Sequence, residues 1–188
     1  QTFTFWTTLP GQTAFRGILE VPAGHYLRIR EGCIDRIRYW SPDFSRPDEQ
    51  LRETPAALCE RVRAVLEDAV RIRLRADVPV GAYLSGGLDS SGIAAILRRR
   101  FHRDLHTFGI RFEQDAYDEG EHQQRMAALL RTHHREIRAG DASIASALVH
   151  AIRHCERPLL RTAPAPLYLL SRLVRESGLK VVLTGEGA

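Results

Sequence analysis

The stretch VGAYLSGGLDSSGIAA, from Val80 to Ala95, joins a strand-like run to a helix-like run through a glycine-rich loop. The apolar run 78–84 is short, contains Val and Tyr, and stops at a glycine pair, which favours a buried strand. From Ser90 to Arg100 apolar residues recur at helical spacing, and the terminal arginines suit the carboxyl end of a helix dipole. The stretch therefore predicts a strand, a tight loop and a helix N-terminus in direct succession.

Residues 45–188 continue this alternation of strand-like and helix-like runs. Helical periodicity predicts helices over 55–74, 119–131, 142–154 and 166–177, and apolar runs predict strands over 105–112, 133–139 and 180–184. Such alternation is typical of a parallel sheet with helices on both faces. The predicted fold class is therefore α/β.

Residues 1–44 have a different pattern, in which short alternating runs are separated by Pro and Gly. The runs cover 2–7, 14–21, 25–30 and 34–40, and they predict a small β meander. The segment 41–50, rich in Pro, Asp and Ser, is typical of a linker, so we place a domain boundary at about residue 44. The chain begins without methionine and stops after a glycine-rich turn, and we expect it to be a fragment of a longer protein.

The composition, with 44% hydrophobic and 27% charged residues, is that of an ordinary globular protein. No apolar run approaches the roughly 20 residues that span a bilayer, and a signal peptide is not evident, so we expect a cytoplasmic protein without a membrane partner. The net charge is +4, but the arginines are scattered and only residues 98–100 cluster, without stacking aromatics. We therefore expect no nucleic-acid partner. The three widely spaced cysteines are expected to be reduced thiols.

The loop Ser85-Gly86-Gly87-Leu88-Asp89-Ser90-Ser91 follows the first predicted strand of the α/β region. Its glycines permit close backbone approach, and its amides, its hydroxyls and the helix N-terminus can face an anion, which predicts a phosphate cradle. A P-loop is excluded, because no lysine follows the glycines. Asp89 would repel phosphate unless a divalent cation lies between them, so Mg²⁺ is implied. A tight turn with a capping side chain is the simpler alternative.

A second glycine motif, Thr184-Gly185-Glu186-Gly187-Ala188, follows the last predicted strand. The glycines on both sides of Glu186 would leave this carboxylate uncrowded at a sheet end, as suits a proton acceptor or a metal partner. A surface turn is an equally good explanation of this motif alone.

The pair LSGGLDSS and KVVLTGEGA, about 100 residues apart, resembles the synthetase domain of glutamine-hydrolysing asparagine synthetases, members of the PP-loop ATP pyrophosphatases. TFGIRF, YDE, HH and ERPLLRTAPAPLYLLSRL follow the family's order between the two motifs. Residues 1–44, with GILEVPAGHYL and YW, resemble the last strands of the family's glutamine amidotransferase domain. The resemblance implies an incomplete amidotransferase domain over 1–44 and an incomplete ATP-binding domain over 45–188.

The resemblance also implies roles for single positions. The matching nucleotide-binding positions are Leu84, Ser85, Gly86, Gly87, Asp89, Ser90, Ser91, Gly109, Ile110 and Gly185. The serines and paired glycines would hold the pyrophosphate part of ATP, and Asp89 would bind Mg²⁺. The backbone of Leu84, Gly109 and Ile110 would frame the adenosine, and Gly185 would close over the nucleotide. Asp118 is a further candidate for the nucleotide end of the site.

The implied reaction is the ATP-dependent amidation of a carboxylate, with aspartate as the first candidate. The carboxylate would attack the α-phosphate of ATP, and ammonia derived from glutamine would then attack the acyl adenylate while Glu186 accepts a proton. The family's glutaminase nucleophile is an N-terminal cysteine, whereas this chain starts with Gln1. We therefore expect these 188 residues alone to hydrolyse no glutamine, to bind nucleotide weakly and to be inactive.

Several alternatives stay open. The acid could differ, as in β-lactam-forming or peptide-amidating relatives, or the chain could be a catalytically silent nucleotide-binding module. A PP-loop enzyme that modifies transfer RNA is the weakest alternative, since such proteins lack the second motif. A metal site at His150 and His154, one helical turn apart with Cys155 adjacent, is disfavoured, because no further ligand of evident spacing exists and arginines flank them. Exposed strand edges favour self-association, for example as a homodimer.

Overall fold

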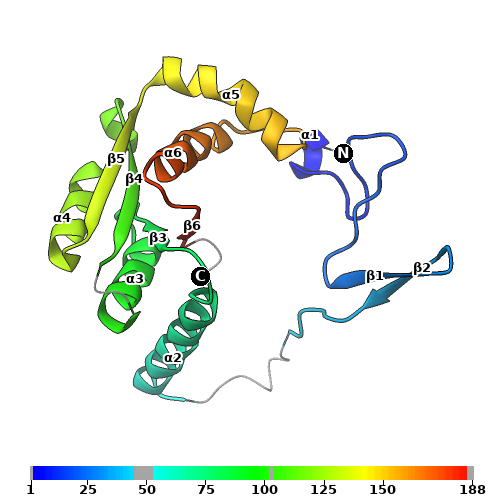
Figure 1. The fold of residues 1–188 in the computed structure, drawn as a ribbon, viewed down its shortest axis with the longest axis horizontal. Coiled ribbons are helices and arrows are strands. Elements are labelled where there is room, and N and C mark those ends of the chain that lie inside the picture. Colours follow the sequence, from blue (N-terminus) through cyan, green and yellow to red (C-terminus); the bar gives the residue numbers. More distant parts are fainter. Residues whose placement is uncertain (1, 45–52, 102–103, 186–188) are drawn as a thin grey trace. The chain divides into compact units, whose positions relative to one another are not determined.

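The computed structural model describes residues 2–44, 53–101 and 104–185 (Figure 1). The chain divides into two units: unit 1 comprises residues 1–52 and 152–161, and unit 2 comprises residues 53–151 and 162–188. Among the described residues, none of the helices combines the length and hydropathy that crossing a membrane requires.

Unit 2 is built on a parallel sheet, as the alternating pattern predicted. Its described strands are β3 (Val80–Tyr83), β4 (His106–Phe112), β5 (His133–Ala139) and β6 (Val181–Leu183). Their order in the sheet is β5-β4-β3-β6, and all of the pairings are parallel. The chain thus moves outward from β3 through β4 to β5 and then returns to the other side of β3, which places a reversal of strand order between β3 and β6.

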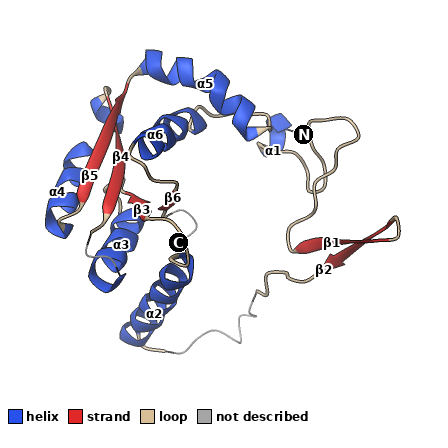
Figure 2. Cartoon of the chain, in the orientation of Figure 1, coloured by secondary structure: helices blue, strands red, loops and turns tan. Residues whose placement is uncertain are grey.

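Helices cover both faces of this sheet (Figure 2). They are α2 (Pro55–Arg73), α3 (Leu88–Ile96), α4 (Gly120–Leu130), α5 (Asp141–Cys155) and α6 (Pro164–Glu176). Local signals explain several ends: Thr54 caps α2 by accepting a hydrogen bond from Ala57 N, and α4 stops at Arg131, which is left-handed at φ 52°. The helix predicted over 90–100 divides into α3 and a π-helical turn, Leu97–Phe101, which the periodicity did not reveal.

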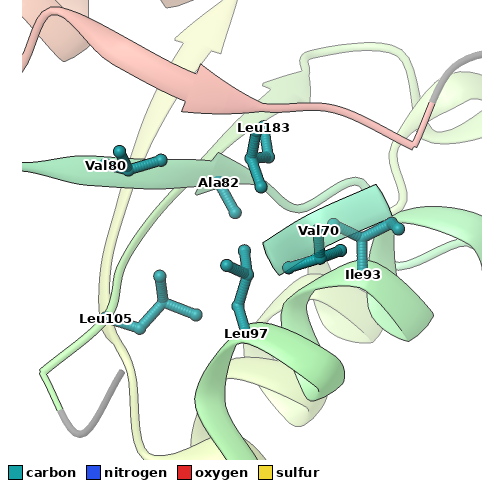
Figure 3. Close-up of a cluster of buried hydrophobic side chains, with 7 residues drawn as sticks. All are labelled: Val70, Val80, Ala82, Ile93, Leu97, Leu105 and Leu183. Carbon is teal, nitrogen blue, oxygen red and sulfur yellow. The ribbon is translucent and has the colours of Figure 1, made fainter. Parts of the chain in front are cut away.

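Apolar side chains from both motifs' strands pack on the same face of the sheet. Figure 3 shows this cluster, which consists of Val70, Val80, Ala82, Ile93, Leu97, Leu105 and Leu183. On the opposite face, Phe108 packs against Leu170, Leu173 and Val174 of α6. Because alternate residues of a strand face opposite sides, β3 contributes Val80 and Ala82 to the first cluster and Tyr83 to the second, which fixes it between the helical layers.

Unit 1 contains an antiparallel hairpin of β1 (His25–Arg30) and β2 (Cys33–Arg38). The two strands are joined by Glu31 and Gly32, whose φ angles are 49° and 78°. Positive φ at both loop residues is the conformation that suits the right-handed twist of a two-residue hairpin. This part of the predicted meander is confirmed.

The first two runs of the predicted meander are corrected by the structure. Residues Thr2–Phe5 form a short helix, α1, in place of the strand expected over 2–7. The run 14–21 contributes only an isolated bridge between Gln12 and Leu19 within the described residues, because Thr13 forms a turn. The Thr13 hydroxyl accepts from Phe15 N and lies 2.7 Å from Ile18 O. Local side-chain hydrogen bonds of this kind compete with extended pairing.

Candidate functional site

A cavity of about 390 Å³ opens at the carboxyl ends of β3 and β6, beside Phe108–Ile110 of β4. Its lining residues are Tyr83, Leu84, Ser85, Asp89, Ser90, Phe108, Gly109, Ile110, Leu167, Leu170, Thr184 and Gly185. The reversal of strand order between β3 and β6 lies at this point, and open α/β sheets bind ligands at such a reversal. The volume is within the range of small-molecule sites.

The loop between β3 and α3 is folded through its own hydroxyl groups. Ser85 N donates to Ser90 Oγ at 3.1 Å, and the two serine hydroxyls lie 2.9 Å apart. Gly87 N donates to Ser85 Oγ at 3.3 Å. Gly87 is the N-cap of α3, and no side chain of the residues that the structure describes caps the helix. The amide groups of the first helical turn are therefore available to an anion.

The two glycine motifs meet at the start of α3. A Cβ added to Gly185 would lie 2.8 Å from Ser90 N and 2.9 Å from Asp89 C. β3 and β6 are neighbours in the sheet, with Ala82 opposite Leu183, so their glycine loops leave the same edge. A glycine at 185 permits the backbone at this position to lie directly against the first turn of the helix.

Most of the predicted nucleotide-binding residues lie around this cavity. Seven line it: Leu84, Ser85, Asp89, Ser90, Gly109, Ile110 and Gly185. Gly86, Gly87 and Ser91 do not line it; Gly86 turns the loop at φ 87°, and the Ser91 hydroxyl is buried without a hydrogen-bond partner among the described residues. Glu186, the predicted proton acceptor, lies outside the described residues.

Several residues of the cavity wall were not predicted from the sequence. Leu167 and Leu170 lie on an apolar stripe of α6, which is typical of a core-facing helix, and both line the cavity. Tyr83 also lines it, and its hydroxyl lies 3.0 Å from Ser171 Oγ of α6. A stripe in the sequence does not reveal which of its residues extend past the end of a strand. Only the fold shows where the strands end, and these ends identify the residues of the stripe that line the cavity.

The site has the chemistry that magnesium and a nucleotide polyphosphate need. Asp89 is the single carboxylate on the cavity wall in the part of the chain that the structure describes. Mg²⁺ is commonly held by one or two carboxylates together with substrate phosphates. The uncapped amides of α3 and the hydroxyls of Ser85 and Ser90 offer hydrogen bonds to phosphate oxygens. The residues present thus fit both groups.

Asp118 has a different environment from the one suggested for it. It accepts hydrogen bonds from Arg111 Nη2 at 2.6 Å and from Phe112 N at 3.1 Å, and it does not line the cavity. The Arg111 guanidinium holds the pKa of the Asp118 carboxyl below its ordinary value, and the hydrogen bond from Phe112 acts in the same direction. Asp118 therefore anchors the segment that leads into α4.

His134 of β5 lies under α4 with its side chain 10% exposed. Its Nδ1 is 3.0 Å from Thr107 Oγ1, and its Nε2 has no hydrogen-bond partner among the described residues. Burial lowers the pKa of His134, although the carboxylate of Glu136, 3.9 Å from Nε2, opposes that shift. The buried imidazole is therefore favoured in its neutral form.

The lowered pKa of His134 predicts a loss of stability in mild acid. The unfolded chain binds a proton at His134 more readily than the folded chain does. The contribution of neutral His134 to the free energy of unfolding is therefore fully present above about pH 6.5 and is lost as the pH falls below this value. We expect His134→Gln to reduce this fall in the free energy of unfolding, measured by urea denaturation between pH 5 and 8. His122→Gln is the control and should retain the wild-type profile, because His122 is exposed on α4 and forms no ion pair within the described part of the chain. If the free energy of unfolding of His134→Gln depended on pH as that of the wild type does, buried His134 would not be the cause of the loss in mild acid.

The parallel sheet, the reversal of strand order and the glycine loop at that reversal define an open α/β protein with a ligand cavity at the switch point of its sheet. The model of the asparagine synthase family matches residues 61–188, and the chain belongs to that family. Recognition of the family from the two glycine motifs is thereby confirmed.

Individual relatives align with nearly the whole chain. A putative glutamine-hydrolysing asparagine synthetase of Mycobacterium tuberculosis is 34% identical over 180 residues, covering 94% of this chain and 27% of the relative. Asparagine synthetase 1 of Bacillus subtilis is 34% identical, covering 91% and 26%. Amidase chyE of Penicillium rubens is 31% identical, covering 96% and 29%. The chain thus spans between a quarter and a third of the length of these curated relatives.

One solved structure, an NH3-dependent NAD synthetase from Campylobacter jejuni, is similar over 66% of this chain and 54% of that chain. The TM-score is 0.44 and the sequence identity is 21%.

Proposed function

We propose that this chain contributes the ATP-binding site of an AMP-forming ligase that amidates a carboxylate, with aspartate as the acid and asparagine as the product. One observation carries the proposal: the two glycine motifs, far apart in the sequence, meet over a single cavity at the reversal of strand order. Membership of the asparagine synthase family supports it. The substrates are then small molecules: ATP, an amino acid and ammonia.

The cavity suggests how the chain's residues divide the work. The uncapped amides of α3 and the hydroxyls of Ser85 and Ser90 bind the pyrophosphate part of ATP and stabilise its charge as it departs. Gly109 and Ile110 of β4 form the wall for the adenosine, opposite Leu167 of α6. Mg²⁺ bound at Asp89 would neutralise phosphate charge.

The proposed chemistry has two steps. A carboxylate oxygen of the acid attacks the α-phosphorus, the bond to the β-phosphate oxygen breaks, and pyrophosphate leaves with the electron pair. Ammonia then attacks the acyl carbon, AMP leaves, and the proton of the attacking nitrogen passes to a base. Glu186 is assigned that last role from its place in the second glycine motif.

A second candidate is a relative that activates another acid by the same chemistry. The observation that favours it is the 31% identity to Amidase chyE, nearly as high as that to the asparagine synthetases. The cavity residues named above are proposed to bind the nucleotide, and none of them is assigned to the acid. The same nucleotide site therefore suits either acid.

The test follows the oxygen of the acid. The intact protein is incubated with Mg²⁺, ATP, ammonia and aspartate whose side-chain carboxylate carries ¹⁸O, and the products are analysed by mass spectrometry. We expect one ¹⁸O atom in AMP and none in inorganic phosphate, because the carboxylate attacks the α-phosphorus. Label in AMP with another acid only would favour the second candidate. ATP binding without AMP from any acid would overturn both and favour a silent nucleotide-binding module.

A further inference from the structure

Gln123 is a fully buried amide in α4, with only 2% of the residue exposed. Its Nε2 donates a hydrogen bond to the carbonyl oxygen of Ile110 at 2.9 Å. Its Oε1 has no hydrogen-bond partner among the described residues and lies against Gly109. A Cβ on Gly109 would come within 2.0 Å of that oxygen. Figure 1 shows α4 alongside β4 and β5, the two strands that flank this contact.

The hydrogen bond to Ile110 replaces one that the sheet no longer supplies. The carbonyl of Phe108, two residues earlier on β4, accepts from Leu84 N at 2.8 Å. The pairing of β3 with β4 ends at Tyr83 and Phe108, so β4 continues beyond its neighbour where the cavity begins. The Ile110 carbonyl points to the same side of β4 as that of Phe108, but no backbone donor of β3 is opposite it. The side chain of Gln123 donates to this carbonyl instead, and it therefore holds β4 where backbone pairing has stopped.

The same turn of α4 also touches the glycine loop on the other side of the cavity. A Cβ on Gly86 would lie 2.7 Å from His122 Cβ and 2.9 Å from Gln123 N. Gly86 has a φ of 87°, which L side chains rarely adopt. One helical turn thus lies against both walls, the loop that begins at Ser85 and the strand segment Gly109–Ile110.

An apolar side chain would fill this position without the unpaired Oε1, but it would leave the Ile110 carbonyl without its donor, so packing alone does not explain a glutamine here. The amide is explained by its hydrogen bond to the Ile110 carbonyl. We propose that Gln123 is a positioning residue that fixes the Gly109–Ile110 wall of the cavity relative to the glycine loop. The choice of ATP as the ligand in the tests below rests on the proposed function, whereas the contact of Gln123 with Gly109 and Ile110 does not.

Gln123→Met tests the hydrogen bond, because methionine has a similar volume and no donor. We expect the intact protein to bind ATP about five- to tenfold more weakly, by isothermal titration calorimetry, since one buried hydrogen bond is lost. In steady-state kinetics the KM for ATP should rise by a similar factor while kcat changes by less than about twofold. The matched control is Gln124→Met, because the Gln124 amide is exposed and donates to Glu136. It should behave as the wild type.

Gly109→Ala tests whether the Gln123 side chain is held in place. If it is, the added methyl group should weaken ATP binding and lower the melting temperature. Gln123→Ala in the same chain should then raise the melting temperature again by making room, but ATP binding should stay weak, because the hydrogen bond to Ile110 is lost. A free side chain would move aside, and Gly109→Ala would then match the wild type. This pair of variants remains informative even if Gln123→Met does not fold.

The outcomes separate this inference from the proposed function. The positioning role would be overturned by wild-type ATP affinity in Gln123→Met. It would also be overturned if Gln123→Ala failed to raise the melting temperature of Gly109→Ala, or if the double variant bound ATP as tightly as the wild type. If the wild type binds no ATP, the proposed function fails. The recovery of the melting temperature in the double variant would still support the contact.

Discussion

Replacing Asp89 by asparagine is expected to lower AMP and pyrophosphate formation by at least about 100-fold. Asp89 lies in the first turn of α3 and is the carboxylate on the described cavity wall. The amide keeps the shape of the side chain but removes the charge that would bind Mg²⁺ beside the phosphates. The loss should therefore appear in kcat and in the Mg²⁺ concentration needed for half-maximal rate.

The fold should survive this change, which makes the result interpretable. Removing one charge near a helix N-terminus costs about 0.3–1 kcal/mol of stability. Asp141→Asn is the matched control, because Asp141 also lies in the first turn of a helix, α5, and does not line the cavity. It should lose similar stability and keep its activity. An Asp89→Asn protein that forms AMP at the wild-type rate with the same Mg²⁺ requirement would contradict the metal role.

The parts of the fold that the sequence predicts best are those with strong local signals. The strand from Val80, the glycine turn and the helix that follows each have a pattern that a short segment carries by itself. Because β3 and β6 both precede glycine motifs, the parallel sheet then brings these motifs to one edge. The main features of the candidate site were therefore predictable before any contact was known.

The errors arose where structure depends on distant partners or on local competition. The run 2–7 alternates like a strand but forms helix α1, and alternation alone cannot supply a neighbouring strand. Leu167 follows the same helical stripe as core residues, yet it lines the cavity. Gln123 lies among helical residues that gave no sign of burial, because its partner Ile110 belongs to another element. Such features require tertiary contacts, which a pattern along one segment does not contain.

Replacing Gly185 by alanine is expected to weaken ATP binding by roughly 10- to 100-fold, corresponding to about 1–3 kcal/mol for overpacking. The added Cβ would lie 2.8 Å from Ser90 N and 2.9 Å from Asp89 C. These are backbone atoms of the first turn of α3, so they cannot rotate away as a flexible side chain can. The strand end and the helix start must separate, which displaces the amides that would hold phosphate.

Gly92→Ala is the matched control for this prediction, because it adds the same methyl group to the helix itself. Apart from the neighbouring backbone of the helix, no atom of the described residues lies within 4 Å of a Cβ at Gly92. Alanine is a better helix former than glycine by about 1 kcal/mol, so the control should raise the melting temperature and keep the wild-type ATP affinity. Calorimetric titration and thermal denaturation of both variants decide the matter. If Gly185→Ala bound ATP as tightly as Gly92→Ala, close approach of the second glycine motif to α3 would not be required for nucleotide binding, and the observation that carries the proposed function would lose its force.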